Sequence, residues 1–432
     1  MRFEKPREIA SRLLLQREAG DDFIENLLEP ALAHAQLSSA DRGLLQELVY
    51  GGVRWQATLD WLIARKTADR PQKPTLQILL RLALYQMFWL SRIPDHAAVN
   101  ETVEIAKRMG FNTQAGFINA VLRGYLRERE ATERLLMDMK QTDPALGFSH
   151  PKWLTERWEK KIGREALLRL LDWNNTAPKT FARLNLLRTN ADQLREQWAR
   201  EKVEAKLVPA EWASDTLVYE LQSFPPLATL PSFTQGLFYI QDPSTLLAIV
   251  ELDPQPGETI LDYCAAPGGK TACIAERMKN EGKIIAHDMA PDRLKLVEEN
   301  CARLGVTCVH PALPSTLSAQ LSTLYDRILI DAPCSNTGVI RRRVDLRWRI
   351  REQEISRLRA TQLQLLRDAM SRLKPGGTLV YSTCSLEPEE NSELVRDFLK
   401  EQPAMHLQRE RSLTPWERNV DGAYVARLVR GA

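Results

Sequence analysis

The sequence has few cysteines, no long uninterrupted apolar run and no low-complexity tract. Its six cysteines form no Cys-x-x-Cys pair and no zinc-ligand spacing, so we expect no metal site. They gather in the C-terminal half without a disulfide-like pattern, which indicates free thiols and a cytoplasmic location. The most apolar stretch, 76–90, is broken by Gln77, Arg81 and Gln86 and is too short to span a bilayer. The charged N-terminus resembles no secretory signal, so we expect no membrane partner.

At 432 residues the chain is long for one hydrophobic core, so we expect several domains. Residues 1–142 show helical spacing of apolar residues and predict an all-α domain. Residues 143–235 combine tryptophans with several prolines and predict a small mixed α/β connecting domain. Residues 236–432 alternate strand and helix patterns, which predict a Rossmann-like α/β domain with a mostly parallel sheet and helices on both faces.

The strands of this last domain indicate where the candidate site is expected. They are predicted, in chain order, at 258–263, 283–288, 306–310, 326–331 and 377–382. Residues 423–428 are predicted to add an antiparallel edge strand. Because ligands bind outside the carboxyl ends of the strands in such a sheet, we expect the functional residues immediately after these segments.

A glycine-rich turn follows the first predicted strand. Asp262 ends the strand, residues 267–269 are Pro-Gly-Gly, and Lys270 opens the next helix. A phosphate-binding loop would need glycine where this chain has Cys264, and the dinucleotide pattern Gly-x-Gly-x-x-Gly is absent. S-Adenosylmethionine carries no phosphate, so its site needs glycines for close backbone approach and an acid for the ribose hydroxyls. Asp288, after the second strand, is placed to supply that acid; a purely structural turn is the alternative.

Two cysteines follow the fourth and fifth predicted strands. Cys334 stands in Asp-Ala-Pro-Cys-Ser and Cys384 in Ser-Thr-Cys-Ser. Carbon 5 of cytosine attacks a sulfonium methyl only after a thiolate has added to C6, and cysteine is partly thiolate at neutral pH. The base must leave its stack to reach such a pocket, where Asp331 is placed to contact its N3/N4 edge. One cysteine at a strand end is usually core filler, but two at one rim predict cytosine-C5 methylation.

Basic residues cluster immediately after Cys334. Between Ser335 and Lys374 the chain has eleven Lys or Arg residues and four acids, a net charge of +7. Such a patch attracts phosphate backbones through counterion release, so we predict an RNA partner. The residues predicted to bind it are Arg341, Arg342, Arg343 and Arg347. A solvated helix face is the alternative interpretation of the same stretch.

Several motifs resemble those of a known family. Residues 331–342 (Asp-Ala-Pro-Cys-Ser-Asn-Thr-Gly-Val-Ile-Arg-Arg) and 381–391 (Tyr-Ser-Thr-Cys-Ser-Leu-Glu-Pro-Glu-Glu-Asn) resemble the cysteine motifs of the RNA cytosine-C5 methyltransferases of the NOL/NOP/Sun family. Residues 92–104 and 116–123 resemble the NusB-like RNA-binding helices of that family. The resemblance extends over nearly the whole chain, so it implies the domain order as well as the chemistry.

The resemblance implies an activity and assigns the site. It implies S-adenosylmethionine as the cofactor and 16S ribosomal RNA as the substrate, with cytosine 967 as the family's usual target. It also implies that Cys384 is the nucleophile, that Cys334 assists release of the covalent adduct, and that Asp331 serves catalysis and borders the cofactor. The other cofactor residues that it implies are Cys264, Ala265, Ala266, Pro267, Gly268, Gly269, Lys270 and Asp288.

One position departs from the family pattern. After the third strand the family usually has Gly-Asp, whose carboxylate reaches the adenine, whereas this chain has Ala312 at the aspartate position. Losing one charge-assisted hydrogen bond predicts weaker cofactor binding by about 1.5–3 kcal/mol. We expect a monomer that methylates small-subunit ribosomal RNA. The alternatives are the same chemistry on another RNA, such as tRNA, and a non-catalytic RNA-binding assembly factor.

Overall fold

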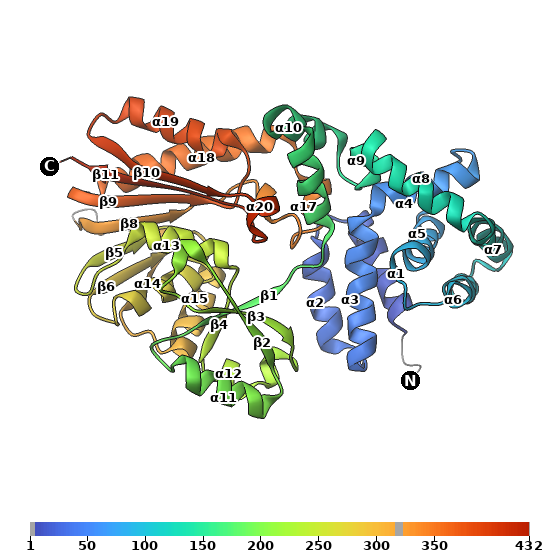
Figure 1. Cartoon of the computed structure of the whole chain (residues 1–432), viewed down its shortest axis with the longest axis horizontal. Coiled ribbons are helices and arrows are strands. Elements are labelled where there is room, and N and C mark those ends of the chain that lie inside the picture. Colours follow the sequence, from blue (N-terminus) through green and yellow to red (C-terminus); the bar gives the residue numbers. More distant parts are fainter. Residues whose placement is uncertain (1–4, 316–322, 432) are drawn as a thin grey trace. The chain divides into compact units, whose positions relative to one another are not determined.

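The computed structural model describes residues 5–315 and 323–431 and separates into two compact units (Figure 1). The first unit contains the chain up to Ala177 together with the distant segment Ile340–Arg349. The second unit contains the rest of the described chain. Each unit has its own hydrophobic core.

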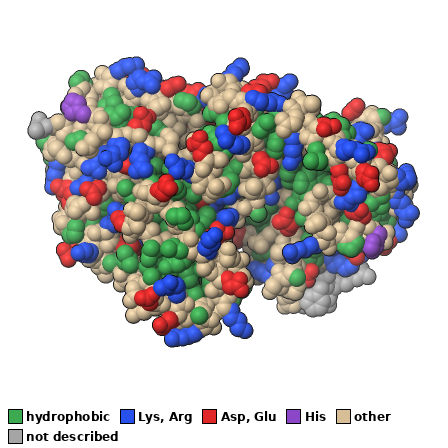
Figure 2. All heavy atoms as spheres, in the orientation of Figure 1, with side chains coloured by type: hydrophobic (Ala, Val, Ile, Leu, Met, Phe, Trp, Pro, Cys, Tyr) green, Lys and Arg blue, Asp and Glu red, His purple; other side chains and the backbone are tan. Residues whose placement is uncertain are grey.

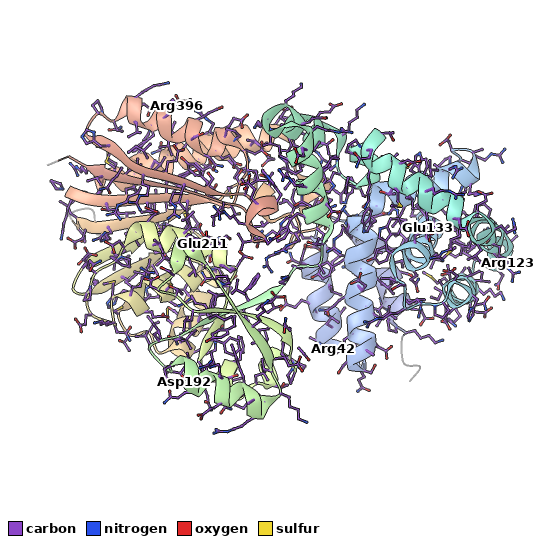
Figure 3. All side chains as sticks on the ribbon, viewed as in Figure 1. Arg42, Arg123, Glu133, Asp192, Glu211 and Arg396 are labelled. Atoms are coloured by element: carbon purple, nitrogen blue, oxygen red, sulfur yellow. The ribbon has the colours of Figure 1, made fainter. Side chains whose placement is uncertain are left out.

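Amphipathic helices build the first unit, which confirms the predicted all-α domain. They are α1 (Pro6–Ala19), α2 (Ile24–His34), α3 (Ser39–Arg54), α4 (Gln56–Thr67), α5 (Pro74–Trp89), α6 (Asp95–Arg108), α7 (Asn112–Arg127), α8 (Arg129–Thr142), α9 (Pro144–Gly147) and α10 (Lys152–Asn175). On α7, Ile118 and Leu122 are buried, whereas Arg123 is exposed and extends outward in Figure 3. Most of these helices direct an apolar stripe into the shared core and a polar face to solvent, whereas α5 is buried from Ile78 to Met87 and lies inside that core.

Helix α10 belongs to the first unit by its contacts. At its C-terminal end, the side chain of Asn175 donates a hydrogen bond of 2.8 Å to the carbonyl of Phe148. Nearer its start, Trp158 lies edge-on to the ring of His150, with 6.3 Å between the ring centres. The domain boundary predicted at residue 142 therefore falls inside this unit, which continues to Ala177.

Buried charges anchor the segment Ile340–Arg349, which includes α17 (Leu346–Arg349), in the first unit. Asp345 is fully buried and accepts hydrogen bonds from Arg17 Nε at 2.9 Å, Arg17 Nη2 at 2.7 Å and the backbone nitrogen of Ile24 at 2.8 Å. Arg347 is also fully buried. It donates to the carbonyls of Arg54, Ser149 and Asn174 and to the side-chain oxygen of Asn175.

This placement corrects part of the predicted RNA-binding patch. Arg347 is 0% exposed and Arg341 is 1% exposed, and the Arg341 guanidinium lies 3.9 Å from the ring centre of Trp173. Neither side chain presents its charge to a phosphate backbone, so the prediction is wrong for these two residues. Arg343 is exposed and Arg342 is half-buried, and for them RNA binding stays a prediction. Figure 2 shows basic and acidic side chains interspersed over the visible face.

A four-stranded antiparallel sheet opens the second unit, in the order β2-β3-β1-β4. Its strands are β1 (Thr180–Leu184), β2 (Glu204–Val208), β3 (Val218–Ser223) and β4 (Phe238–Ile240), and its helices are α11 (Ala191–Glu201) and α12 (Pro231–Thr234). Leu194 and Trp198 of α11 pack with Phe238, while Asp192 extends from the outer face of that helix in Figure 3. The predicted small mixed domain is confirmed, although β4 lies beyond the boundary predicted at residue 235.

The larger sheet has the order β10-β11-β9-β8-β5-β6-β7 and is parallel from β7 to β9. Its strands are β5 (Thr259–Asp262), β6 (Lys283–His287), β7 (Val309–Ala312), β8 (Tyr325–Asp331), β9 (Leu373–Thr383), β10 (Met405–Leu413) and β11 (Ala423–Arg430). Its longer helices are α13 (Leu246–Leu252), α14 (Gly269–Arg277), α15 (Pro291–Leu304), α18 (Glu352–Ser371) and α19 (Ser392–Glu401), and α20 spans Pro415–Arg418. This arrangement is the predicted Rossmann-like fold.

Helices cover both faces of the larger sheet (Figure 1). Neighbouring residues of β5 face opposite sides, so Ile260 packs in the cluster with α13, α14 and α15, and Leu261 packs in the cluster with α18 and α19. The layered fold predicted from the alternating strands and helices is therefore confirmed. Within the described ranges, no helix combines the length and the apolar character needed to cross a bilayer.

The C-terminal strands differ from the prediction in one respect. Strand β11 is antiparallel to β9, as predicted, but it is not the edge of the sheet, because β10 pairs along its other side. The run from His406 to Glu410 on β10 is exposed throughout. Apart from Leu407 this exposed run is polar, so it carries no apolar alternation and the sequence pattern did not reveal the strand.

Candidate active site

The ends of four parallel strands meet at one edge of the larger sheet. Strand β5 ends at Asp262, Asp288 follows β6, β8 ends at Asp331, and Cys384 follows β9. Strand β5 pairs with both β6 and β8, and β8 pairs with β9, so these ends are neighbours. The strand order reverses between β5 and β8, the switch point at which open α/β sheets bind ligands. The structure thus brings the predicted site segments together.

The turn after β5 requires its glycines. Gly268 has φ +101°, a left-handed conformation, and its backbone nitrogen donates to the carbonyl of Ala265 at 2.8 Å. A β-carbon on Gly269 would lie 2.5 Å from the ring of Tyr239, and one on Gly268 would lie 3.2 Å from the α-carbon of Val297. Larger residues would therefore open this turn, whose close packing leaves its backbone free to approach a ligand.

Asp288 is held beside the turn. It is 4% exposed and accepts weak hydrogen bonds from the backbone nitrogens of Ala266 and Ala290, both at 3.3 Å. Arg293 lies 3.4 Å from its carboxylate. Burial raises the pKa of the Cys264 thiol in the same turn, so that thiol stays neutral. A carboxylate beside a tight, uncharged backbone turn fits the ribose of S-adenosylmethionine, because this cofactor needs no anion cradle.

Lys270 contacts the cysteine side of the site. Its ammonium nitrogen lies 2.7 Å from Asp331 Oδ2, and the hydroxyl of Ser382 donates to Asp331 Oδ1 at 2.9 Å. Burial alone would lower the pKa of Lys270, but the charge and hydrogen bond of Asp331, with Cys384 nearby, raise it above its ordinary value. The ammonium ion therefore persists at neutral pH. Lys270 was predicted as a cofactor residue, and its observed partner is Asp331.

The two cysteines face each other, with their sulfur atoms 3.5 Å apart. Cys384 is half-buried and donates to the side-chain oxygen of Asn336 at 3.1 Å. Cys334 is 7% exposed, and the pKa of its thiol is raised by the hydrogen bond with Cys384, by burial, by the charge of Cys384 and by the charge of Glu390. Cys334 therefore keeps its proton, whereas Cys384 is the more accessible sulfur.

A pocket of about 60 Å³ reaches Cys384 but not Cys334. Lys270, Asp331, Thr383 and Cys384 line one part of it, and Val339 and Gly422 line another. The sulfur of Cys384, the carboxylate of Asp331 and the ammonium group of Lys270 therefore border one opening. The cofactor turn and the cysteine pair share this rim through Lys270.

Comparison with known proteins identifies the family of this chain. The profile of the family described as 16S rRNA methyltransferase RsmB/F matches residues 249–429. The NusB family matches residues 4–127, and the RsmF/B-like ferredoxin-like domain matches residues 150–220. A Bacillus subtilis protein named probable ribosomal RNA small subunit methyltransferase B is 38% identical over 402 residues, which cover 92% of this chain and 88% of the relative. The chain belongs to the RsmB/F family of 16S rRNA methyltransferases.

Further relatives support this placement in the RsmB/F family. The ribosomal RNA small subunit methyltransferase B of Cronobacter sakazakii is 38% identical and covers 93% of each chain. A solved methyltransferase homologue from Pyrococcus horikoshii is 30% identical, with a TM-score of 0.59, and covers 67% of this chain and 98% of that one. This RsmB/F member is an S-adenosylmethionine-dependent RNA methyltransferase.

Sequence reasoning missed three polar residues of this methyltransferase site: Asn336, Ser382 and Glu390. All three stand inside or next to the quoted cysteine motifs, at 331–342 and 381–391. Their types alone resemble ordinary loop residues, and only the meeting of β8 and β9 shows that they converge. Their closeness to two cysteine motifs was the signal that could have identified them.

The family departure at Ala312 lies at the end of β7. Ala312 is 3% exposed and packs in the cluster that contains Leu261, and its carbonyl accepts a hydrogen bond of 2.7 Å from His287 Nδ1. The next residue, Leu313, packs against the other cluster, which includes Ala265 of the cofactor turn. Apolar side chains therefore occupy this part of the RsmB/F fold, and the weaker adenine recognition stays a prediction.

Proposed function

We propose that this methyltransferase transfers a methyl group from S-adenosylmethionine to C5 of a cytosine in 16S ribosomal RNA through a covalent cysteine–cytosine intermediate. The observation that carries the proposal is the distance of 3.5 Å between the sulfurs of Cys334 and Cys384. This pair stands beside the ion pair of Lys270 and Asp331, at the carboxyl ends of two adjacent parallel strands. A reaction that needs one thiolate to attack and a second group to assist release suits such a pair.

The proposed reaction forms one sulfur–carbon bond to the base and later breaks it. The thiolate of Cys384 adds to C6 of the cytosine, and the electron pair of the C5–C6 bond becomes available at C5. Carbon 5 then takes the methyl group that S-adenosylmethionine, when bound, would supply from its sulfonium centre, and the sulfur would keep the bonding electron pair as a neutral thioether. A base then removes the proton from C5, and the sulfur–C6 bond breaks to restore the ring and the free Cys384 thiolate.

Asp331 and Lys270 are proposed to hold the base for this attack. Asp331 is half-buried in the pocket, where a carboxylate can accept a hydrogen bond from the cytosine N4 amino group. The ammonium group of Lys270 stays charged and close to Cys384, so it stabilises the attacking thiolate. Residues 264–268 and Asp288 are proposed to hold the cofactor, because the turn is tight and uncharged and the carboxylate faces it.

The ranking of the two cysteines follows accessibility. Cys384 lines the pocket and is half-buried, which supports it as the nucleophile. Cys334 is 7% exposed and keeps its proton, which supports a later role in releasing the adduct. The names of the relatives support ribosomal RNA of the small subunit as the substrate. Arg342 and Arg343 are the proposed phosphate contacts that remain from the basic stretch.

The central test is covalent capture of RNA by cysteine variants. We expect Cys384→Ala to abolish both methylation and capture, and Cys334→Ala to leave RNA bound as a denaturant-resistant adduct. The matched control is Cys308→Ala, a buried cysteine that precedes β7, which should methylate as the wild type does. Gel analysis with 16S RNA and labelled S-adenosylmethionine measures both outcomes. The reverse pattern would exchange the two roles, and no adduct in any variant would refute the covalent route.

Substrate class and cofactor binding need separate measurements. Label transfer to protein-free 16S RNA, assembled small subunits and bulk tRNA should occur with the ribosomal RNA, and transfer to tRNA alone would refute the proposed substrate. Calorimetry with S-adenosylmethionine should detect binding. An absence of heat at millimolar cofactor would instead favour an RNA-binding assembly factor.

A further inference from the structure

A buried carboxylate lies behind the two cysteines. Glu390, at the end of the short helical turn η5 (Pro388–Glu390), is fully buried. Its Oε1 accepts the backbone N–H of Ser335 at 2.9 Å. Its Oε2 accepts the Ser385 hydroxyl at 2.5 Å and also the Ser335 hydroxyl. The two hydroxyl oxygens lie 2.9 Å apart, so the serines that directly follow the two cysteines converge on one side chain.

We propose that Glu390 is the positioning residue that fixes the separation of the two cysteine sulfurs. It acts through Ser335 and Ser385, each one residue from a cysteine, rather than on the reacting atoms. The inference rests on the proposed two-cysteine chemistry and adds a residue to it. A carboxylate that joins the two loops sets their relative position, and a sulfur displaced by about 1 Å from a reacting carbon can lower a rate by about 10²-fold.

The carboxylate is itself held from two other elements. Gln362 of α18 donates to Glu390 Oε1 at 3.0 Å and to the carbonyl of Pro333 at 2.9 Å. The hydroxyl of Tyr381 on β9 donates to the backbone carbonyl of Glu390 at 2.7 Å. Each carboxylate oxygen therefore receives two donors. A buried charge is stable only when it is hydrogen-bonded in this way, and full satisfaction makes the group rigid.

A carboxylate serves this position better than a neutral amide would. The four donors to Glu390 are a backbone amide, two hydroxyls and a side-chain amide, and a carboxylate can accept from all of them. Ser385 Oγ also accepts the backbone N–H of Glu387 at 3.0 Å, so its own proton is free to point at the carboxylate. A glutamine would place its NH₂ group either against the two N–H donors or against the two serine hydroxyls, which would then have to turn and accept, so this hydrogen-bond network could not form unchanged.

The charge of Glu390 also affects the titration of Cys334. The pKa of the Cys334 thiol is raised by its hydrogen bond with Cys384, by burial and by this carboxylate. Glu390 therefore adds to the influences that keep Cys334 protonated, while its bonds to Ser335 and Ser385 hold that sulfur 3.5 Å from Cys384. Removal of the charge changes the titration of one cysteine as well as its position, and a purely structural role would not produce that change.

The test replaces the carboxylate of Glu390 with an amide on a side chain of the same length. In Glu390→Gln we expect methylation of 16S RNA to fall about 10²-fold. We also expect the pH midpoint for alkylation of Cys334 by iodoacetamide, followed by peptide mass spectrometry, to move down, because one of the charges that raise the pKa of this thiol is removed. Dibromobimane, which bridges closely spaced thiols, should cross-link Cys334 to Cys384 less efficiently than in the wild type. The exposed Glu393→Gln, on the following helix, is the matched control and should behave as the wild type.

A second variant keeps the inference testable if Glu390→Gln does not fold. Ser385→Ala removes one donor and leaves the carboxylate charge, so it should lower cross-linking and methylation while the Cys334 alkylation midpoint stays near that of the wild type. If Glu390→Gln does not fold, equal cross-linking in Ser385→Ala and wild type overturns the inference. If it folds, unchanged alkylation and cross-linking overturn it. If the wild type neither methylates nor captures RNA, the proposed function fails, and the cross-linking comparison still decides the role of Glu390.

Discussion

The side-chain oxygen of Asn336 lies 3.1 Å from the sulfur of Cys384. The amide nitrogen of the same side chain donates to the carbonyl of Cys334 at 2.7 Å, and this bond fixes which end of the amide faces the sulfur. An amide oxygen accepts the S–H of a thiol but repels a thiolate. In the resting enzyme this hydrogen bond occupies the S–H of the proposed nucleophile, and it must break before the sulfur can react.

Removing this contact should make Cys384 more reactive. Asn336 has φ +57°, a left-handed conformation that glycine adopts freely, so Asn336→Gly deletes the side chain without backbone strain. We expect iodoacetamide to alkylate Cys384 about 2–10-fold faster at neutral pH, which corresponds to the loss of one hydrogen bond. Asn336→Asp should slow the reaction, because a carboxylate repels the thiolate more strongly. Peptide mass spectrometry measures both rates, and equal rates in all three proteins would contradict the assignment.

Replacement of Lys270 should damage catalysis more than cofactor binding. Its ammonium group pairs with Asp331 at 2.7 Å rather than with the turn, so Lys270→Gln removes a charge-assisted bond worth about 1.5–3 kcal/mol. We expect kcat to fall about 10–150-fold, while the dissociation constant of S-adenosylmethionine changes by less than about threefold. Lys295→Gln, an exposed lysine on α15, is the control and should match the wild type. A large loss of cofactor affinity with unchanged kcat would show that Lys270 serves cofactor binding instead.

Much of the site could be predicted because the sheet imposes it. Apolar strand patterns end at Asp331 and just before Cys384, and parallel strands direct their carboxyl ends to one edge, so sequence alone brings these residues together. The partners of Glu390 could not be predicted in the same way. A glutamate in a polar loop resembles a solvated charge, and only the pairing of β8 with β9 places Ser335 and Ser385 against it.

The basic stretch after Cys334 illustrates the opposite error. Local charge counting treats every arginine as exposed, but the burial of Arg347 depends on acceptors contributed by residues 54, 149 and 174. These lie far from it in the sequence, so no local pattern reports them. Asp345 is buried in the same way against Arg17. Helices and strands follow local periodicity, whereas the satisfaction of a buried charge is a property of the tertiary fold.

Arg347 should therefore contribute to stability rather than to RNA affinity. Arg347→Ala leaves several buried oxygens without a donor and creates a cavity, so we expect the first unit to lose about 3 kcal/mol or more of unfolding free energy. The exposed Arg343→Ala, in the same segment, should leave stability unchanged within about 0.5 kcal/mol and reduce the salt dependence of RNA binding by about one charge. Denaturation curves and binding titrations at several salt concentrations separate the two effects. An Arg347→Ala protein with unchanged stability and weakened RNA binding would restore the original prediction.

Asp262, at the end of β5, is a buried acid that keeps its proton to a higher pH in the folded chain than in the unfolded chain. It is 0% exposed, and its Oδ2 accepts the Thr271 hydroxyl at 2.7 Å. Its Oδ1 has no hydrogen-bond partner among the described residues. Burial raises the pKa of this carboxyl to about 7, whereas an unfolded aspartate titrates near 3.9. Between about pH 4 and pH 7 the unfolded chain releases this proton and the folded chain does not, so stability falls as pH rises through this range.

Asp262→Asn should remove this pH dependence, since an amide oxygen still accepts the Thr271 hydroxyl but does not titrate. Relative to the wild type, we expect the variant to gain about 3 kcal/mol of unfolding free energy on going from pH 5 to pH 8. Denaturant unfolding of both proteins at the two pH values measures the gain. The control is Asp253→Asn, at an exposed position in the left-handed conformation. It should change the unfolding free energy by the same amount at the two pH values. A wild-type to Asp262→Asn difference that does not change with pH would show that the buried carboxyl is already ionised in the folded enzyme.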